Sequence, residues 1–523
     1  MGKAQEDGNR QQPRHLKRIP TILAAGFFLF MVLTPPPRGL VAMMSEPSPV
    51  GYRLQSGTKT ITGSVNKVLK ADLSPEEIAR KAKVMIAVLF MAALLWATEA
   101  IPLGATDLLV GALLYLFFIL PFDTISKAYM QDAVFFIFGV LTIALGVGKV
   151  GLDRRIGLLM LSGIRGIKGF CFIFLPLLAI AAGFLSEHAL IAILAPVLLR
   201  AYRLICDAQE LERDRPLALM LLLGICFAAN QGGPGSPAAG GRNAVMVGYL
   251  KDHGAPISFG QWVFYSLPFV LVCSLAVGAA IYLMLGRRVK SRNINFSQFF
   301  REEVQKLGPM SRGEITMAVI LALVVVLWVA GSKQFGLGGP CVFGVVLMLI
   351  AGTVSWKDIQ LGVRFDVVGL YAAACAMGVG LKITGGSLWL ARSAIDLLPP
   401  SLRGGDSLLL ATSLFTATMT NFMSDGATVA SVGPVALAMA SVSGVHVWKV
   451  GFACAFSSSF ANMLIVGTPN NAIAYVSGED PRTGERLVHL KDFLLYGIPV
   501  TLIACLTLWL WTILGYWRWM NWP

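Results

Sequence analysis

A succession of long apolar blocks constrains the fold of this chain more than any other feature of its sequence. About thirteen such blocks lie between residues 20 and 517, and each approaches or exceeds the ~20 residues that a helix needs to cross a bilayer. The 523 residues are 56% hydrophobic and only 14% charged, which is more apolar than a soluble core of this size requires. We therefore predict an all-α polytopic membrane protein.

The basic residues are concentrated in the connections between these blocks. The formal net charge is +14, which in a soluble protein would suggest a nucleic-acid partner. In a membrane protein the same pattern is the ordinary orientation signal, so we expect a lipid bilayer and no nucleic acid as partner. Residues 1–83 are expected to form a cytoplasmic N-terminus, a first transmembrane helix and a polar connection.

One polar motif occurs twice inside apolar blocks. Ser186-Glu-His188 is followed by a Pro-Val pair, and Ser424-Asp-Gly426 is followed by the same pair at the same spacing. Ionisable groups at membrane depth are costly and usually functional. We therefore expect Glu187 and Asp425 to face a cavity.

The chain also contains two segments in which glycine and proline interrupt an apolar block. The first lies in 216–250 and ends in Arg242-Asn243, and the second lies in 446–476 and contains Thr468-Pro-Asn-Asn471. Paired interruptions in two halves of a chain point to a transport site near the bilayer midplane. We predict one repeat over 84–287, with a hairpin at 168–204, a cytoplasmic connection at 288–313, and an inverted repeat over 314–523, with a hairpin at 406–443.

The two hairpin tips and the two broken helices should meet, because unpaired backbone at membrane depth is tolerated only against protein or a wet cavity. Helix N-termini at the tips direct partial positive charge inward, which suits an anionic substrate. Free carbonyl groups at the breaks suit a cation. Both kinds of ligand are therefore expected at one place.

These motifs resemble those of the divalent anion/sodium symporter family, which includes dicarboxylate, citrate and sulfate transporters. The resemblance runs from about Trp96 to the C-terminus and rests on Trp96-Ala-Thr-Glu-Ala-Ile-Pro-Leu103, residues 132–148, both tips, and Gly467-Thr-Pro-Asn-Asn-Ala-Ile473. It implies an inverted repeat of about eleven transmembrane helices with two re-entrant helical hairpins and two broken helices. It also implies a homodimer and an elevator-type movement of the domain that holds the tips.

The tips depart from the family, whose members usually carry Ser-Asn-Thr there, and both asparagines are replaced by acids. The residues expected to bind substrate are Ser186, Glu187, His188, Arg242, Asn243, Ser424, Asp425, Gly426, Thr468, Pro469 and Asn471. The residues expected to bind a cation, either sodium or a proton, are Ser186, Glu187, Gly233, Thr420, Asp425 and Gly467.

Three interpretations of the altered tips stay open. Acids are good ligands for hard cations, so sodium coupling can persist. Alternatively, Glu187, Asp425 and His188 titrate, so that protons replace sodium. In the third, Arg242 is a fixed cation and the carrier exchanges anions without sodium. Arg242 could also snorkel to an interface or pair structurally with an acid.

The leading interpretation is a secondary active transporter of small anions, most of all dicarboxylates, in the plasma (inner) membrane. No cofactor is expected, and Na⁺ is one candidate for the coupling ion beside the proton-coupled and exchange alternatives. A neutral or zwitterionic substrate is the alternative within transport. An intramembrane enzyme is disfavoured, because one histidine without a second His or Cys at ligand spacing makes a weak metal site. A duplicated helix break is explained by transport and not by catalysis.

Overall fold

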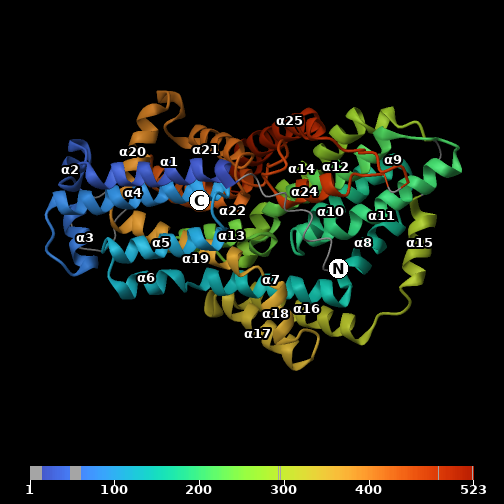
Figure 1. Cartoon of the computed structure of the whole chain (residues 1–523), viewed down its shortest axis with the longest axis horizontal. Coiled ribbons are helices and arrows are strands. Elements are labelled where there is room, and N and C mark those ends of the chain that lie inside the picture. Colours follow the sequence, from blue (N-terminus) through green and yellow to red (C-terminus); the bar gives the residue numbers. More distant parts are fainter. Residues whose placement is uncertain are drawn as a thin grey trace.

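The computed structural model describes residues 14–47, 60–291, 294, 296–480, 482–520 and 522. Within these residues every regular element is helical, and the helices pack into an elongated bundle (Figure 1). The predicted all-α class is confirmed. Residues 1–13, part of the predicted cytoplasmic N-terminus, lie outside the described residues.

Eight helices of the described chain are long and apolar enough to cross a membrane, or up to nine if the pair 18–33 and 38–44, bent by 61°, is one span. Shorter apolar helices of 10–17 residues fall below this criterion, and the predicted total of about eleven spans stays a prediction. The eight are Phe122–Val150, Glu187–Ala208, Arg215–Gly235, Phe259–Arg288, Arg312–Ser332, Phe365–Ile383, Asp425–Val442 and Leu490–Trp519.

Helices α2 to α6 lie toward one end of the bundle (Figure 1), where α1 packs along α4 and α5 packs against α19, whereas α8 packs against α11 and α15. Ser74 starts α4: its hydroxyl accepts a hydrogen bond from the amide of Glu77, whose carboxylate accepts one from the amide of Ser74. The elements are α1 Arg14–Leu33, α2 Arg38–Met44, α3 Ile61–Leu69, α4 Pro75–Thr98, α5 Leu103–Leu116, α6 Phe122–Tyr129, α7 Asp132–Val150 and α8 Leu152–Ser162.

The central third contains two helices that meet at the connection 183–186 and one helix that is interrupted at 233–240. The elements are α9 Gly166–Gly169, η2 Phe170–Phe174, α10 Leu175–Ala182, α11 Glu187–Ala208, α12 Arg215–Gly232, η3 Gly233–Gly235, η4 Pro237–Ala239, α13 Gly241–Asp252, α14 Phe259–Met284 and η5 Gly286–Arg288.

The last part of the chain has the same two features, a short connection at 420–424 and an interruption at 458–468. The elements are α15 Phe296–Lys306, α16 Arg312–Phe335, α17 Gly338–Ile350, α18 Trp356–Gly362, α19 Phe365–Ile383, α20 Gly386–Leu397, η6 Pro400–Leu402, α21 Gly405–Met419, α22 Asp425–Val442, α23 Val447–Ser457, α24 Pro469–Val476, α25 Leu490–Leu506, η7 Thr507–Tyr516 and α26 Trp517–Trp519.

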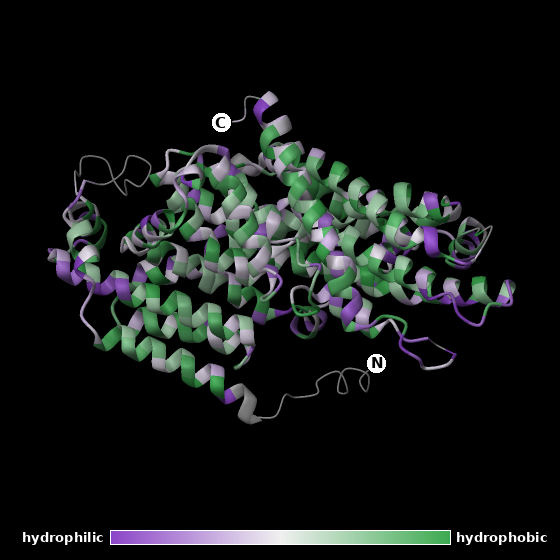
Figure 2. Ribbon diagram, turned by 90° about the horizontal axis from the view of Figure 1, so that it is seen from above, coloured by the Kyte–Doolittle hydropathy of each residue, from purple (hydrophilic) through white to green (hydrophobic). Residues whose placement is uncertain are grey.

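The two parts interlock. Helix α11 packs against α24, which comes from the last part of the chain, and α22 packs against α13 from the central part. Helix α12, almost wholly buried, lies among α10, α11 and α14. Hydrophobic residues predominate along the helices and hydrophilic ones gather in the connections (Figure 2). The protein is a multi-pass integral membrane protein.

Candidate substrate and cation site

Each of the two repeated tip motifs starts a helix. The hydroxyl of Ser186 accepts a hydrogen bond from the amide of Ala189 at 3.4 Å, and the hydroxyl of Ser424 accepts one from the amide of Ala427 at 3.4 Å. Serine is a favoured N-cap because its side chain satisfies an amide that has no partner within the helix. The acid that follows each serine is therefore the first residue of its helix, Glu187 in α11 and Asp425 in α22.

The two broken segments are held by the same pattern of hydrogen bonds. The Nδ2 of Asn243 donates to the carbonyl of Gly233 at 2.8 Å and to that of Ser236 at 2.7 Å. The Nδ2 of Asn471 donates at 2.7 Å to two carbonyls that also lie ten and seven residues earlier in the chain. Each asparagine thus donates to carbonyl groups that have no helical partner because of the interruption. Buried backbone carbonyls need such hydrogen bonds.

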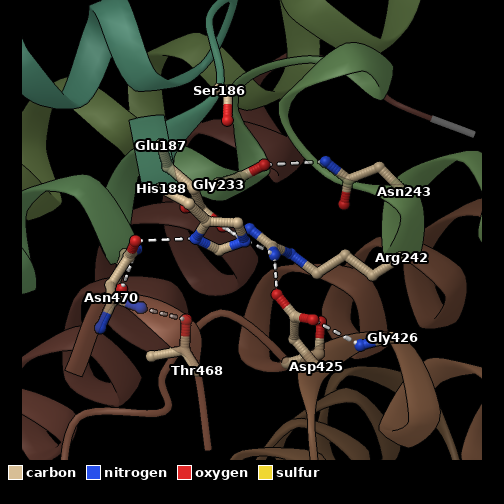
Figure 3. Close-up of polar contacts among 12 residues, drawn as sticks. Ser186, Glu187, His188, Gly233, Arg242, Asn243, Asp425, Gly426, Thr468 and Asn470 are labelled. Carbon is tan, nitrogen blue, oxygen red and sulfur yellow. Dashed lines mark hydrogen bonds and ion pairs between the residues drawn. The ribbon is translucent and has the colours of Figure 1, made fainter. Parts of the chain in front are cut away.

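Arg242 lies between the two tips (Figure 3). It belongs to the first turn of α13 and is 2% exposed. Its Nη1 donates to Oε1 of Glu187 at 3.2 Å and also to Oδ2 of Asp425. One guanidinium therefore bridges the acids of both tips, so Arg242 pairs with acids and does not snorkel to an interface.

The bridged groups do not cancel in charge. With Glu187, Asp425 and Arg242 ionised, one negative charge is left over. Several buried polar atoms around them have no hydrogen-bond partner in the described chain: Nε and Nη2 of Arg242, Oε2 of Glu187, Oδ1 of Asn243 and Oγ of Ser459. Buried polar atoms without partners are costly, so this cluster is suited to receive a polar ligand.

His188 is attached to a chain of asparagine side chains. Its Nδ1 lies 2.8 Å from Oδ1 of Asn470, whose Nδ2 donates to Oδ1 of Asn230 at 2.8 Å. Asn230 in turn donates to Oδ1 of Asn462 at 3.0 Å. Because the amide group of Asn470 is oriented by Asn230, its oxygen faces the imidazole, and Nδ1 of His188 is the donor. The other ring nitrogen, Nε2, lies on the side of the acids, 3.9 Å from Oε1 of Glu187.

Glycines bring the backbone close to the guanidinium. A Cβ on Gly233 would overlap Nη2 of Arg242, and one on Gly240 would lie 2.9 Å from Nη1. On the other side, Tyr371 of α19 presses against the second tip, where a Cβ on Gly426 would lie 2.6 Å from its hydroxyl. The residues around Arg242 leave no room for larger side chains.

The remaining predicted residues lie around the centre formed by Arg242, Glu187 and Asp425. The hydroxyl of Thr468 accepts from the amide of Asn470 at 3.4 Å, and Pro469 is the first residue of α24. Thr420 donates to the carbonyl of Ser458 at 2.6 Å, and its own carbonyl packs on Gly467. Thr420 and Gly467 therefore lie together, whereas the carboxylate of Asp425 is directed at Arg242. The predicted roles of all these residues in binding stay predictions.

Three residues of the centre were not predicted. Asn230 and Asn470 orient His188, and Tyr371 packs on the second tip. Asn230 lies beside Gln231 at the end of an apolar run, and polar side chains at membrane depth commonly bond across helices, so this signal was present in the sequence. No pattern identified Tyr371, because an aromatic residue in an apolar helix is usually a packing residue.

Comparisons with known proteins agree with this architecture. Relatives include the sodium-dependent high-affinity dicarboxylate transporter 3 of Caenorhabditis elegans, 27% identical over 74% of this chain and 76% of its own length. The Na(+)/citrate cotransporter of Rattus norvegicus is 25% identical over 78% and 86%. The dicarboxylate transporter SdcS of Staphylococcus saprophyticus is 24% identical over 77% and 82%.

The fold is similar to that of the YdaH transporter of Alcanivorax borkumensis, with a TM-score of 0.55 at 15% identity over 96% of this chain and 99% of that one. The sequence model of the sodium:sulfate symporter transmembrane region matches residues 72–522, and the predicted family is confirmed. This chain belongs to the sodium:sulfate symporter family.

Proposed function

We propose that this protein is a secondary active transporter of small dicarboxylates that binds its substrate between the tips of the two hairpins. One observation carries the proposal: the first turns of four helices meet there. Glu187 and His188 open α11, Arg242 opens α13, Asp425 opens α22 and Asn470 opens α24, and these side chains contact one another in the pairs described above.

Four converging helix N-termini favour an anion, since each contributes a partial positive charge. Nε and Nη2 of Arg242 form the edge of the guanidinium that binds a carboxylate through two parallel hydrogen bonds, and neither atom has a hydrogen-bond partner among the described residues. The excess negative charge of the tips opposes an anion. A substrate dianion therefore needs at least one cation with it, and sodium is the candidate that the names of the relatives support.

The proposed mechanism is alternating access of the elevator type in a homodimer within the plasma (inner) membrane. It is supported by the matched construction of the two halves, 84–287 and 314–523, in which equivalent serines cap the tips and equivalent asparagines tie the breaks at identical spacing. Inverted repeats that share one central site are the usual basis of alternating access. We propose that the tips and broken helices move together, since they interlock.

A zwitterionic substrate is the second candidate, and the excess negative charge favours it. Oε2 of Glu187 is buried and has no hydrogen-bond partner within the part of the chain that the structure describes, so an ammonium group could pair with it while a carboxylate pairs with Arg242. Such a substrate would need no accompanying cation for charge balance.

The test is uptake of labelled succinate into proteoliposomes that hold the purified protein. The three conditions are an inward sodium gradient, an inward proton gradient, and internal dicarboxylate alone. Saturable uptake competed by unlabelled dicarboxylates supports the proposal, and the driving condition identifies the coupling. Absence of succinate uptake under all three, with uptake of a zwitterionic amino acid instead, would replace the first candidate by the second.

A further inference from the structure

Arg242 occupies the space expected for a cation at the first tip. The residues predicted to hold a cation there are Ser186, Glu187 and Gly233, and the guanidinium touches two of them: Nη1 donates to Glu187, and Nη2 lies against Gly233. A guanidinium in contact with a carboxylate and backbone supplies the positive charge that a metal ion would otherwise bring to the same ligands.

At this tip the guanidinium already occupies the position beside Glu187 and Gly233 that a cation would take. Nη2 fills the position that a Cβ on Gly233 would take, and Nη1 is close to Gly240 on the other side. A metal ion placed within about 4 Å of the guanidinium would also meet strong repulsion inside a buried site. A mobile cation and Arg242 are therefore alternatives at this tip.

The second half offers no equivalent charge. Arg242 immediately precedes Asn243, and the residue that immediately precedes the matching Asn471 is Asn470, which is neutral. Thr420 and Gly467 lie together near the second tip, and in the described part of the chain the Thr420 hydroxyl and the Gly467 amide donate to the backbone carbonyls of Ser458 and Leu464. The substitution of a fixed charge is confined to one half of the site.

We propose that Arg242 is a tethered cation that replaces a bound cation at the first tip, so that the carrier takes a cation from solution only at the second tip. This inference rests on the proposed function, because it specifies how many cations accompany the substrate. It predicts at most one sodium ion bound per protomer.

The first experiment removes the tethered charge. In Arg242→Ala, Glu187 and Asp425 are left facing a vacated space, which should bind sodium. We expect sodium, and not choline at equal ionic strength, to raise the thermal unfolding midpoint of this purified variant, with half of the effect at a tenfold or more lower concentration than any response of the wild type. Equal sodium responses of the two proteins would overturn the proposal.

Two controls separate the tethered charge from a general loss of a buried arginine. The first control is Arg155→Ala. Nε of Arg155 lies 2.6 Å from Oε1 of Glu314, and neither residue belongs to the tips. The sodium response of this variant should match that of the wild type. Arg242→Lys keeps a positive charge and should also respond like the wild type. A sodium-specific gain in either variant would contradict the assignment.

A second measurement needs no variant and covers the case in which Arg242→Ala does not fold. Binding of ²²Na⁺ to the purified wild-type protein is titrated to saturation. None or one sodium ion per protomer agrees with the proposal, and two would overturn it. Neither experiment uses a transported substrate, so failure of succinate uptake would refute the proposed function and leave this inference to be judged separately.

Discussion

Because Arg242 is shared by two acids, removing either one should cost far less than removing both. In Glu187→Gln the guanidinium keeps Asp425, and in Asp425→Asn it keeps Glu187. Each single variant weakens one charge-assisted hydrogen bond but also removes the excess negative charge. Because these two effects oppose each other, we expect the free energy of unfolding to fall by about 1 kcal/mol or less.

The double variant leaves a guanidinium that is 2% exposed with no acid. Breaking a buried ion pair from one side costs roughly 3–5 kcal/mol, because the remaining charge is uncompensated. The double loss exceeds the sum of the two single losses, which is at most about 2 kcal/mol, so the coupling between the two substitutions should be about 1 kcal/mol or more.

The assay is reversible chemical unfolding of the wild type, both single variants and the double variant in mixed micelles, followed by tryptophan fluorescence. The control cycle uses two acids that pair with different arginines, Glu46 with Arg392 and Asp406 with Arg518, and its effects should add. If the effects at Glu187 and Asp425 also add within about 0.5 kcal/mol, the guanidinium is not shared and the account of the site is wrong.

Three further predictions concern the surroundings of the site and the fold. Gly233→Ala places a Cβ on Nη2 of Arg242 and should reduce succinate uptake at least about tenfold, whereas Gly260→Ala, where nothing lies within 4 Å, should leave uptake unchanged. Asn470→Leu deprives Asn230 of its donor and His188 of its acceptor. We expect the free energy of unfolding to fall by about 1–3 kcal/mol, because a buried polar group is left unsatisfied. The unfolding midpoint measures this loss, and an unchanged midpoint would mean that the chain of amides does not stabilise the fold. The ammonium group of Lys149 holds the pKa of Asp358 below its usual value. This pair therefore stabilises the fold above about pH 4, and its contribution is lost as the pH falls further. The acid-induced drop in the unfolding midpoint should be smaller in Asp358→Asn than in the wild type.

The class of fold followed from the sequence because length and apolarity of a segment are local properties. A block of about 20 apolar residues has few alternatives to a membrane helix. The number of spans did not follow as simply, since shorter apolar helices such as α5 and α17 fall below the length criterion. The sequence predicted that the tips and the broken helices meet, but it did not predict which helices pack together, α11 with α24 and α22 with α13, because these contacts join distant segments.

The residues of the site were identified more readily than their contacts. Ser186 and Ser424 stood out because the Ser-acid motif is repeated, and the structure shows that each caps its helix with the same hydrogen bond. The sequence left open whether Arg242 reaches an interface or an acid, because a long side chain can do either. Asn470 was passed over beside Asn471, although it is the residue that contacts His188.

The most direct test of the central claim is an experimental structure of the protein in lipid nanodiscs with saturating succinate. The account predicts density for the dicarboxylate at the first turns of α11, α13, α22 and α24, with one carboxylate in contact with the guanidinium of Arg242. Succinate bound elsewhere, with Arg242 still enclosed by Glu187 and Asp425, would contradict it.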